Sequence, residues 1–217
     1  METSTCDFNN IGYLLSDVPD DVMLAIRNEV NSIQNDFSLG IPRNKNLAGH
    51  IRQEYRLDKC QKILEPFVLD LVIKYDSYYK NLKEFNFQTH NVPMIIENPW
   101  VNFQKKYEFN PVHNHKGLMS FVIYLQIPYD LNQEFEQGPG GLADDPITGC
   151  FQFIYTNSLG QIVTHRVNVD KSFENKILLF PAKMPHCVYP FYTSDDYRIS
   201  VAGNVILDTS RYDYSPR

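Results

Sequence analysis

Two histidines separated by a single residue, His113 and His115, are the first candidates for chemistry in the 217-residue sequence. If the chain around them is extended, successive side chains alternate between two faces, so both imidazoles project from the same face. Imidazole nitrogens that converge on one point suit a borderline metal ion such as iron, zinc, copper or manganese. A His-x-His pair alone is more often a pair of surface or hydrogen-bonded histidines, so a metal site needs further ligands.

A third histidine, His186, opens an apolar run far along the chain, after the segment Phe-Pro-Ala-Lys-Met-Pro. Two antiparallel strands can bring it opposite the His-Asn-His triplet, which would give three imidazoles at one place. The other histidines, His50, His90 and His165, match no motif position. We expect them to be structural or surface residues.

A possible receptor for a carboxylate follows His186. Arg198 and Ser200 share one face of a strand, and a guanidinium beside a hydroxyl binds a carboxylate well. The phenol of Tyr124, on the strand after the triplet, could reach the same carboxylate. The alternatives are a surface salt bridge of Arg198 with Asp195 or Asp196, and an ordinary core role for Tyr124.

The elements that must position these residues change character along the chain. Apolar residues recur every three or four positions over residues 20–37 and 57–75, which predicts two amphipathic helices. Pro66 inside the second run predicts a kink, or a helix that begins there. From Trp100 onward, short β-type runs alternate with turn residues, which predicts seven or more antiparallel strands. Residues 129–149 are rich in Gly, Pro and Asp and are predicted to form a long surface loop.

Composition limits the class of protein. A chain of this length suits a single domain. Its net charge of −6 makes nucleic acid an unlikely partner. No apolar run is long enough to cross a membrane, and residues 1–10 lack the features of a signal peptide, so we expect a cytoplasmic protein. The four cysteines form no CxxC pair and are expected to be free thiols.

Taken in order, these motifs resemble the 2-oxoglutarate/Fe(II)-dependent oxygenases. The closest likeness is to oxygenases common in tailed phages of marine cyanobacteria and in some marine bacteria, and a phage-encoded enzyme would act in the host cytoplasm. The resemblance covers about residues 100–207. It is carried by the runs Trp-Val-Asn (100–102), His-Asn-His (113–115), Ser-Phe-Val-Ile-Tyr-Leu (120–125), Phe-Pro-Ala-Lys-Met-Pro-His-Cys-Val-Tyr-Pro-Phe (180–191) and Arg-Ile-Ser-Val-Ala-Gly-Asn (198–204).

The resemblance implies a mainly β fold with flanking N-terminal helices. The fold is a double-stranded β-helix, a jelly-roll or cupin-like barrel. Residues 1–217 would form one domain, with a helical support region at 1–95 and the barrel core at 96–210. The implied cofactors are Fe(II) and O2, with 2-oxoglutarate as cosubstrate.

The resemblance also assigns roles to single residues. His113, His115 and His186 would be the metal ligands, although the superfamily usually has Asp or Glu where this chain has His115. Either His115 ligates the metal, which we favour, or water replaces it. Arg198 would pair with the distal carboxylate of 2-oxoglutarate. Ser200, Tyr124 and, more weakly, Asn102 would add hydrogen bonds.

We therefore expect a dioxygenase, a hydroxylase similar to the prolyl hydroxylases, that acts on a peptidyl or small-molecule substrate. A free amino acid and a nucleobase are alternatives, and the net acidity argues against the nucleobase. The sequence carries no signal for an oligomeric state. One competing hypothesis is a cupin metalloenzyme that does not use 2-oxoglutarate, although the glutamate of the cupin pattern is missing after His115. The other is a non-catalytic, phage-associated β-domain.

Overall fold

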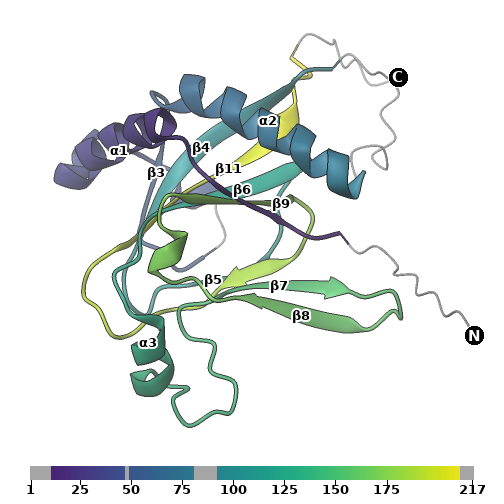
Figure 1. Ribbon diagram of the computed structural model, residues 1–217. Helices are drawn as coiled ribbons and strands as arrows, with labels where there is room; N and C mark the ends of the chain where they lie inside the picture. The colour runs from purple at the N-terminus through teal and green to yellow at the C-terminus, as the bar shows by residue number, and fades with distance from the viewer. Residues whose placement is uncertain (1–10, 47–48, 81–91, 211–217) are drawn as a thin grey trace, which may run out of the picture.

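The computed structural model describes residues 11–46, 49–80 and 92–210, which form two antiparallel sheets and three α-helices (Figure 1). The larger sheet has the strand order β1-β9-β6-β11-β4-β3-β2, and the smaller one β5-β10-β7-β8. The larger sheet contains β1 (Leu14–Asp17), β2 (Ile41–Pro42), β3 (Gln53–Arg56), β4 (Met94–Gln104), β6 (Met119–Gln126), β9 (Lys176–Pro181) and β11 (Arg198–Leu207). The smaller sheet contains β5 (Asn110–His113), β7 (Phe151–Thr156), β8 (Ile162–Val167) and β10 (His186–Val188).

The larger sheet is the middle layer of the molecule. Helices α1 (Asp20–Asn35) and α2 (Gln61–Tyr79) lie on one side of it and the smaller sheet on the other (Figure 1). Alternation along each strand divides the side chains accordingly. Ile123 of β6 and Val201 of β11 pack in the cluster that contains the helices, whereas Tyr124 of β6 packs in a second cluster with residues of the smaller sheet. Two facing antiparallel sheets are the arrangement expected of the double-stranded β-helix, so the predicted fold class is confirmed.

Both predicted helices are present, with different bounds. In α1 the buried residues repeat at helical spacing, and one of them, Glu29, uses its carboxylate to accept the backbone N–H groups of Asp58, Lys59 and Cys60. These N–H groups precede the first turn of α2, so Glu29 fastens one helix to the start of the other. The second helix begins at Gln61 and continues through Pro66, so the alternative that it begins at Pro66 is wrong.

The first 95 residues contribute more than helices. Strand β1 pairs with β9, and β3 pairs with β4, so the region predicted as a helical support supplies three strands of the larger sheet. Each of these strands has four residues or fewer, which is too short for an alternating pattern to stand out in the sequence.

The segment predicted as one long surface loop, residues 129–149, contains helix α3 (Leu131–Gln137). The side chain of Asp130 caps its start by accepting the backbone N–H groups of Asn132 and Gln133. Glu134 of α3 is completely buried and accepts the backbone N–H groups of Tyr192 and Thr193. The segment is therefore anchored to the chain that leads into β11, and it is not only a surface loop.

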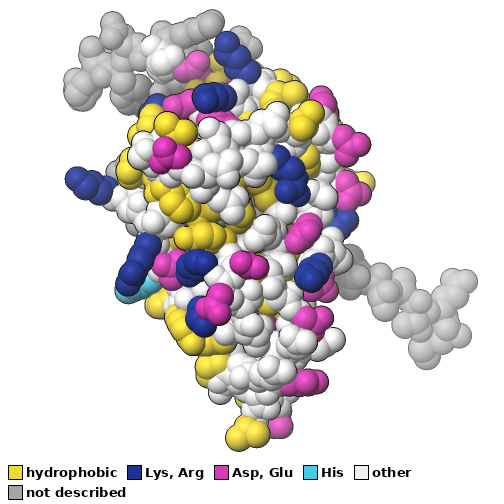
Figure 2. Space-filling model, turned by 90° about the vertical axis from the view of Figure 1, so that its left-hand side faces the viewer, with side chains coloured by type: hydrophobic (Ala, Val, Ile, Leu, Met, Phe, Trp, Pro, Cys, Tyr) yellow, Lys and Arg dark blue, Asp and Glu magenta, His cyan; other side chains and the backbone are white. Residues whose placement is uncertain are grey.

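The described residues bear on two expectations, the absence of a membrane-spanning segment and the free state of the cysteines. None of the helices among the described residues is long and apolar enough to cross a membrane. Cys60, Cys150 and Cys187 are buried free thiols, as predicted, while Cys6 lies outside the described residues. Acidic and basic side chains are interspersed over the face shown in Figure 2.

Candidate active site

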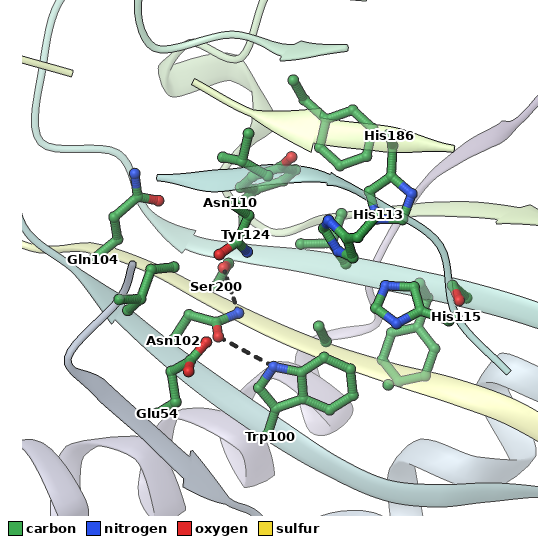
Figure 3. A pocket seen from close by; sticks show the side chains of 18 of the residues that line it. Glu54, Trp100, Asn102, Gln104, Asn110, His113, His115, Tyr124, His186 and Ser200 are labelled. Atoms are coloured by element: carbon green, nitrogen blue, oxygen red, sulfur yellow. Dashed lines mark hydrogen bonds between the residues drawn. The ribbon is translucent and has the colours of Figure 1, made fainter. Parts of the chain in front are cut away.

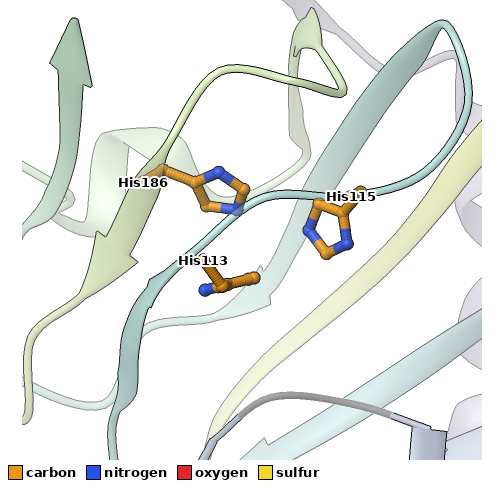
Figure 4. A group of neighbouring side chains, drawn as sticks. All are labelled: His113, His115 and His186. Carbon is orange, nitrogen blue, oxygen red and sulfur yellow. The ribbon is translucent and has the colours of Figure 1, made fainter.

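Three histidines meet between the two sheets. His113, at the end of β5, is the register partner of His186, the first residue of β10. His115 follows two residues later, where its backbone N–H donates to the carbonyl of Ala182 at 2.8 Å. One ring nitrogen from each of the three residues lies within 4.8 Å of the others (Figure 4). This donor set could hold one metal ion.

Backbone carbonyls fix the tautomers of two of these histidines. Nδ1 of His113 lies 2.7 Å from the carbonyl oxygen of Pro111, and Nδ1 of His186 lies 2.9 Å from that of Met184. A carbonyl can only accept a hydrogen bond, so each Nδ1 carries the proton. In the neutral ring the lone pair is then on Nε2. This tautomer can ligate a metal through Nε2 while its Nδ1–H is held by a hydrogen bond.

Burial keeps the three rings neutral. Loss of solvent lowers the pKa of His113, and it lowers that of His115 to about 4 and that of His186 to about 3. Mutual repulsion between the rings is a smaller cause for His115 and His186. The ring of His186 is stacked on Phe151, with centroids 5.3 Å apart, and meets the edge of Phe180 at 4.8 Å. At neutral pH all three imidazoles are free of the proton that would block a metal.

A row of polar side chains crosses the inner face of the larger sheet beside the histidines (Figure 3). The register places Tyr124 of β6 opposite Ser200 of β11, Ser200 opposite Asn102 of β4, and Asn102 opposite Glu54 of β3. Asn102 donates to the Ser200 hydroxyl at 3.4 Å and accepts from the indole N–H of Trp100 at 3.1 Å. Burial raises the pKa of the Tyr124 phenol, which therefore keeps its proton and can donate.

The guanidinium of Arg198 lies at the same pocket and is 2 % exposed. Its Nε and Nη2 donate to Oε1 of Gln104 at 3.0 and 2.6 Å, and Nη2 also donates to the carbonyl of Tyr189 at 3.2 Å. Its Nη1 donates to the hydroxyl of Tyr129 at 2.9 Å and to the carbonyl of Gly149 at 2.8 Å.

All these acceptors of Arg198 are uncharged, and among the described residues no carboxylate forms an ion pair with it. The alternative of a surface salt bridge with Asp195 or Asp196 is therefore wrong. Asp195 pairs with Lys106 at 2.6 Å. A buried cation that has only neutral partners would be stabilised by an anion beside it, because an isolated buried charge is unfavourable.

The seven residues selected from the sequence thus line one pocket: Asn102, His113, His115, Tyr124, His186, Arg198 and Ser200. Among the histidines that match no motif, His50 is exposed and stacks on Phe109, and His165 is exposed on β8. His90 lies outside the described residues.

Several other residues of the pocket, among them Glu54 and Gln104, were assigned no role from the sequence. Glu54 is on a four-residue strand far from every motif, so no signal pointed to it. Gln104 is two residues beyond Asn102 on β4, and strand alternation could have placed it on the same face.

Glu54 is a buried carboxyl group, only 3 % exposed, that accepts a hydrogen bond from the amide of Asn44 at 3.1 Å. Burial, with a smaller contribution from Glu108, raises its pKa to about 7. An unfolded glutamate has a pKa of about 4.3, so the native state binds more protons between pH ~4 and ~7. Stability is therefore lost as the pH rises through this range, and the loss is complete above pH 7.

Glu54→Gln should remove this penalty, because the amide has no charge to bury. We expect the variant to match the wild type near pH 4 and to be more stable by about 1–3 kcal/mol at pH 8. Urea unfolding at the two pH values measures the difference. Glu136→Gln, on the exposed side of α3, is the control and should change stability little at either pH. A Glu54→Gln variant that is less stable than the wild type at pH 8 would contradict the assignment.

Comparison with known proteins finds a family similarity over part of the chain. Residues 98–204, just under half of the chain, match a family model described as "Putative 2OG-Fe(II) oxygenase". All seven residues selected from the sequence lie inside the matched segment, and Glu54 lies outside it. No curated protein matches the sequence.

Solved structures share the fold at low identity. A prolyl-4-hydroxylase of Pseudomonas putida has a TM-score of 0.55 and 14% identity, over 89% of this chain and 91% of that one. A prolyl hydroxylase of Trichoplax adhaerens, in complex with a peptide fragment of the hypoxia inducible factor oxygen degradation domain, has a TM-score of 0.53 and 14% identity, over 94% and 87%. AviO1 of Streptomyces viridochromogenes Tue57 has a TM-score of 0.54 and 10% identity, over 99% of both chains.

Residues 98–204 are thus similar to the 2OG-Fe(II) oxygenases, and the fold of the chain is shared with solved prolyl hydroxylases. The similarity indicates a 2-oxoglutarate-dependent oxygenase, an oxidoreductase, and enzymes of that family use Fe(II), 2-oxoglutarate and O2. Enzymes of this class act on small-molecule or peptide substrates.

Proposed function

We propose that the protein is a hydroxylase in which His113, His115 and His186 hold Fe(II), and Arg198 binds the distal carboxylate of 2-oxoglutarate. The observation that carries the proposal is one pocket that holds both three neutral imidazoles and a buried guanidinium with only neutral partners. A metal ion at the histidines would bind one end of a dicarboxylate cosubstrate, and the Arg198 guanidinium would bind the carboxylate at its other end. Ser200, Tyr124 and Asn102 contribute hydrogen bonds to it.

The donor set fits a divalent iron ion. Two of the rings present Nε2 because their Nδ1–H groups are held by backbone carbonyls, and all three are neutral at pH 7. The common two-His-one-carboxylate site carries one negative ligand, whereas three imidazoles carry none. The charge at this metal is therefore one unit more positive, which favours an anionic cosubstrate. We favour ligation by His115 over its replacement by water, since its ring shares the cluster.

The residues of the chain bind the metal, orient the cosubstrate and shield the metal ligands from water. Bound Fe(II) and 2-oxoglutarate supply the oxidative chemistry, in which O2 converts 2-oxoglutarate to succinate and carbon dioxide and one oxygen atom hydroxylates the substrate. Arg198 orients the cosubstrate, and the protonated Tyr124 phenol donates to it. Phe151 and Phe180 close the apolar side of His186 and exclude water from that ligand.

For the substrate we infer a peptidyl group of the kind that prolyl hydroxylases accept, with a small molecule as the second candidate. The support is the shared fold of two prolyl hydroxylases, with TM-scores of 0.55 and 0.53. The relation to oxygenases of marine phages and bacteria, and a cytoplasmic location, stay predictions from the sequence.

Anaerobic addition of Fe(II) and then 2-oxoglutarate to the purified protein tests the proposal. Chelation of the metal by the cosubstrate should produce a metal-to-ligand charge-transfer band in the visible. A protein that binds iron without developing the band would favour the cupin alternative, as would turnover that is independent of 2-oxoglutarate. A protein that binds no divalent metal would favour the non-catalytic β-domain.

A further inference from the structure

Every N–H group of Arg198 already has an acceptor within the protein. The guanidinium has five N–H groups, and the five hydrogen bonds described above use one at Nε, two at Nη1 and two at Nη2. A carboxylate that is to bind Arg198 must therefore take the place of an acceptor that is present now. The identity of that acceptor determines how the cosubstrate enters.

The acceptors differ in position. Tyr129, Gly149 and Tyr189 do not line the pocket, so a ligand inside it does not reach them. Gln104 does line the pocket, and Figure 3 draws it at the end away from the three histidines. Among the acceptors of Arg198, Gln104 is therefore the one that a ligand extending from the metal ligands toward Arg198 contacts.

The side chain of Gln104 also has the geometry of a substitute carboxylate. Its single Oε1 accepts from both Nε and Nη2, which form one edge of the guanidinium and are the pair that a carboxylate can bind with two bonds. Its Nε2 donates to the carbonyl of Glu108 at 2.6 Å, which turns Oε1 toward Arg198. Gln104 and Arg198 are register partners on β4 and β11, so the backbone holds them face to face.

We propose that Gln104 is a neutral placeholder for the cosubstrate carboxylate, and that its displacement from Arg198 sets the affinity for 2-oxoglutarate. The inference rests on the proposed role of Arg198. An amide satisfies the buried guanidinium without neutralising it, so an incoming carboxylate replaces a neutral acceptor by a charged one and gains a stronger hydrogen bond. A carboxylate at position 104 would instead form a permanent ion pair and close the site to anions.

The test compares Gln104→Glu and Gln104→Met by calorimetric titration of 2-oxoglutarate into the Mn(II)-loaded protein. Gln104→Glu should raise the Kd for 2-oxoglutarate by roughly 50-fold or more, since the charge of Arg198 is then neutralised. Gln104→Met keeps the bulk but cannot accept from Arg198, so its Kd should fall by about 3- to 10-fold. Mn(II) affinity should stay within about threefold of the wild type in both. Gln161→Glu adds the same charge on an exposed turn and is the control.

Thermal unfolding without cosubstrate separates this role from a merely structural one. Gln104→Met should unfold at a lower temperature while binding 2-oxoglutarate more tightly, and Gln104→Glu should bind it weakly with an unfolding temperature at or above that of the wild type. A structural role would make affinity and stability fall together. Weaker binding by Gln104→Met overturns the inference, even if Gln104→Glu fails to fold, and so does wild-type affinity in Gln104→Glu.

Arg198→Ala in the same titration separates the proposed role of Arg198 from the placeholder role of Gln104. If it binds 2-oxoglutarate like the wild type, the proposed role of Arg198 fails, and the inference fails with it. If it loses binding while Gln104→Glu keeps wild-type affinity, only the placeholder role of Gln104 fails.

Discussion

Replacing His186 by alanine should abolish stoichiometric iron binding. His186 is 3 % exposed, and its Nε2 is presented to His113 and His115 by the bond from Nδ1 to Met184. Removing a partner of a metal-ligating histidine typically costs 10–100-fold in metal affinity, so removing the ligand itself should cost more than ~100-fold. Metal content after dialysis, and competition with a chromogenic chelator, measure the loss.

Controls show whether this loss belongs to the cluster. His165→Ala removes an exposed histidine of β8 that has no part in the cluster, and it should keep wild-type metal content. His115→Ala decides between ligation and replacement by water: ligation predicts a large loss of affinity, and water predicts almost none. Full metal content in His186→Ala would exclude the three-histidine centre.

Arg198→Ala should raise the Kd for 2-oxoglutarate by a factor of hundreds. Breaking a buried charge pair by removing one partner costs about 3–5 kcal/mol, and each 1.4 kcal/mol is a factor of ten. Arg198→Lys should rescue only in part, because an ammonium group cannot reproduce the two-pronged contact. Ser200→Ala should cost on the order of 1 kcal/mol, the effect of one lost hydrogen bond. Anaerobic titration of 2-oxoglutarate into each Fe(II)-loaded variant gives all three values.

Iron affinity should be almost unchanged in the Arg198 variants, since Arg198 is not a ligand. Arg166→Ala is the matched control, because this arginine of β8 pairs with Asp145 and does not line the pocket. Unaltered 2-oxoglutarate binding by Arg198→Ala would make the Arg-Ile-Ser strand ordinary sheet and would strengthen the cupin alternative.

The sequence predicts the parts of this fold that have long or repetitive patterns. The amphipathic spacing in α1, and the eight and ten residues of β6 and β11, are long enough to show their period. Strands β1 to β3 and helix α3 are too short for that, so they were missed. The candidate ligands were found because His113, His115 and His186 stand in motifs with a chemical meaning.

What surrounds those residues could not be read from the sequence. Arg198 meets Tyr129, Gly149 and Tyr189, which come from segments between regular elements, and no period predicts where such segments lie. Glu54 reaches the pocket only because β3 pairs with β4, a contact between residues about 50 positions apart. Tertiary pairing of this kind decides which buried polar groups share a cavity.

The pairing of β5 with β10 has a consequence for local unfolding. Strand β5 has four residues and lies at the edge of the smaller sheet, where β10 is its one partner among the described strands; their register shifts between His186 and Val188. An ion held by His113 and His186 would cross-link these two strands. Without it, β5 can open at the cost of a few hydrogen bonds, and its amide protons exchange with solvent through that opening. With it, the same opening must also break metal–ligand bonds, so an ion bound by the proposed ligands would also set how often this edge of the pocket opens.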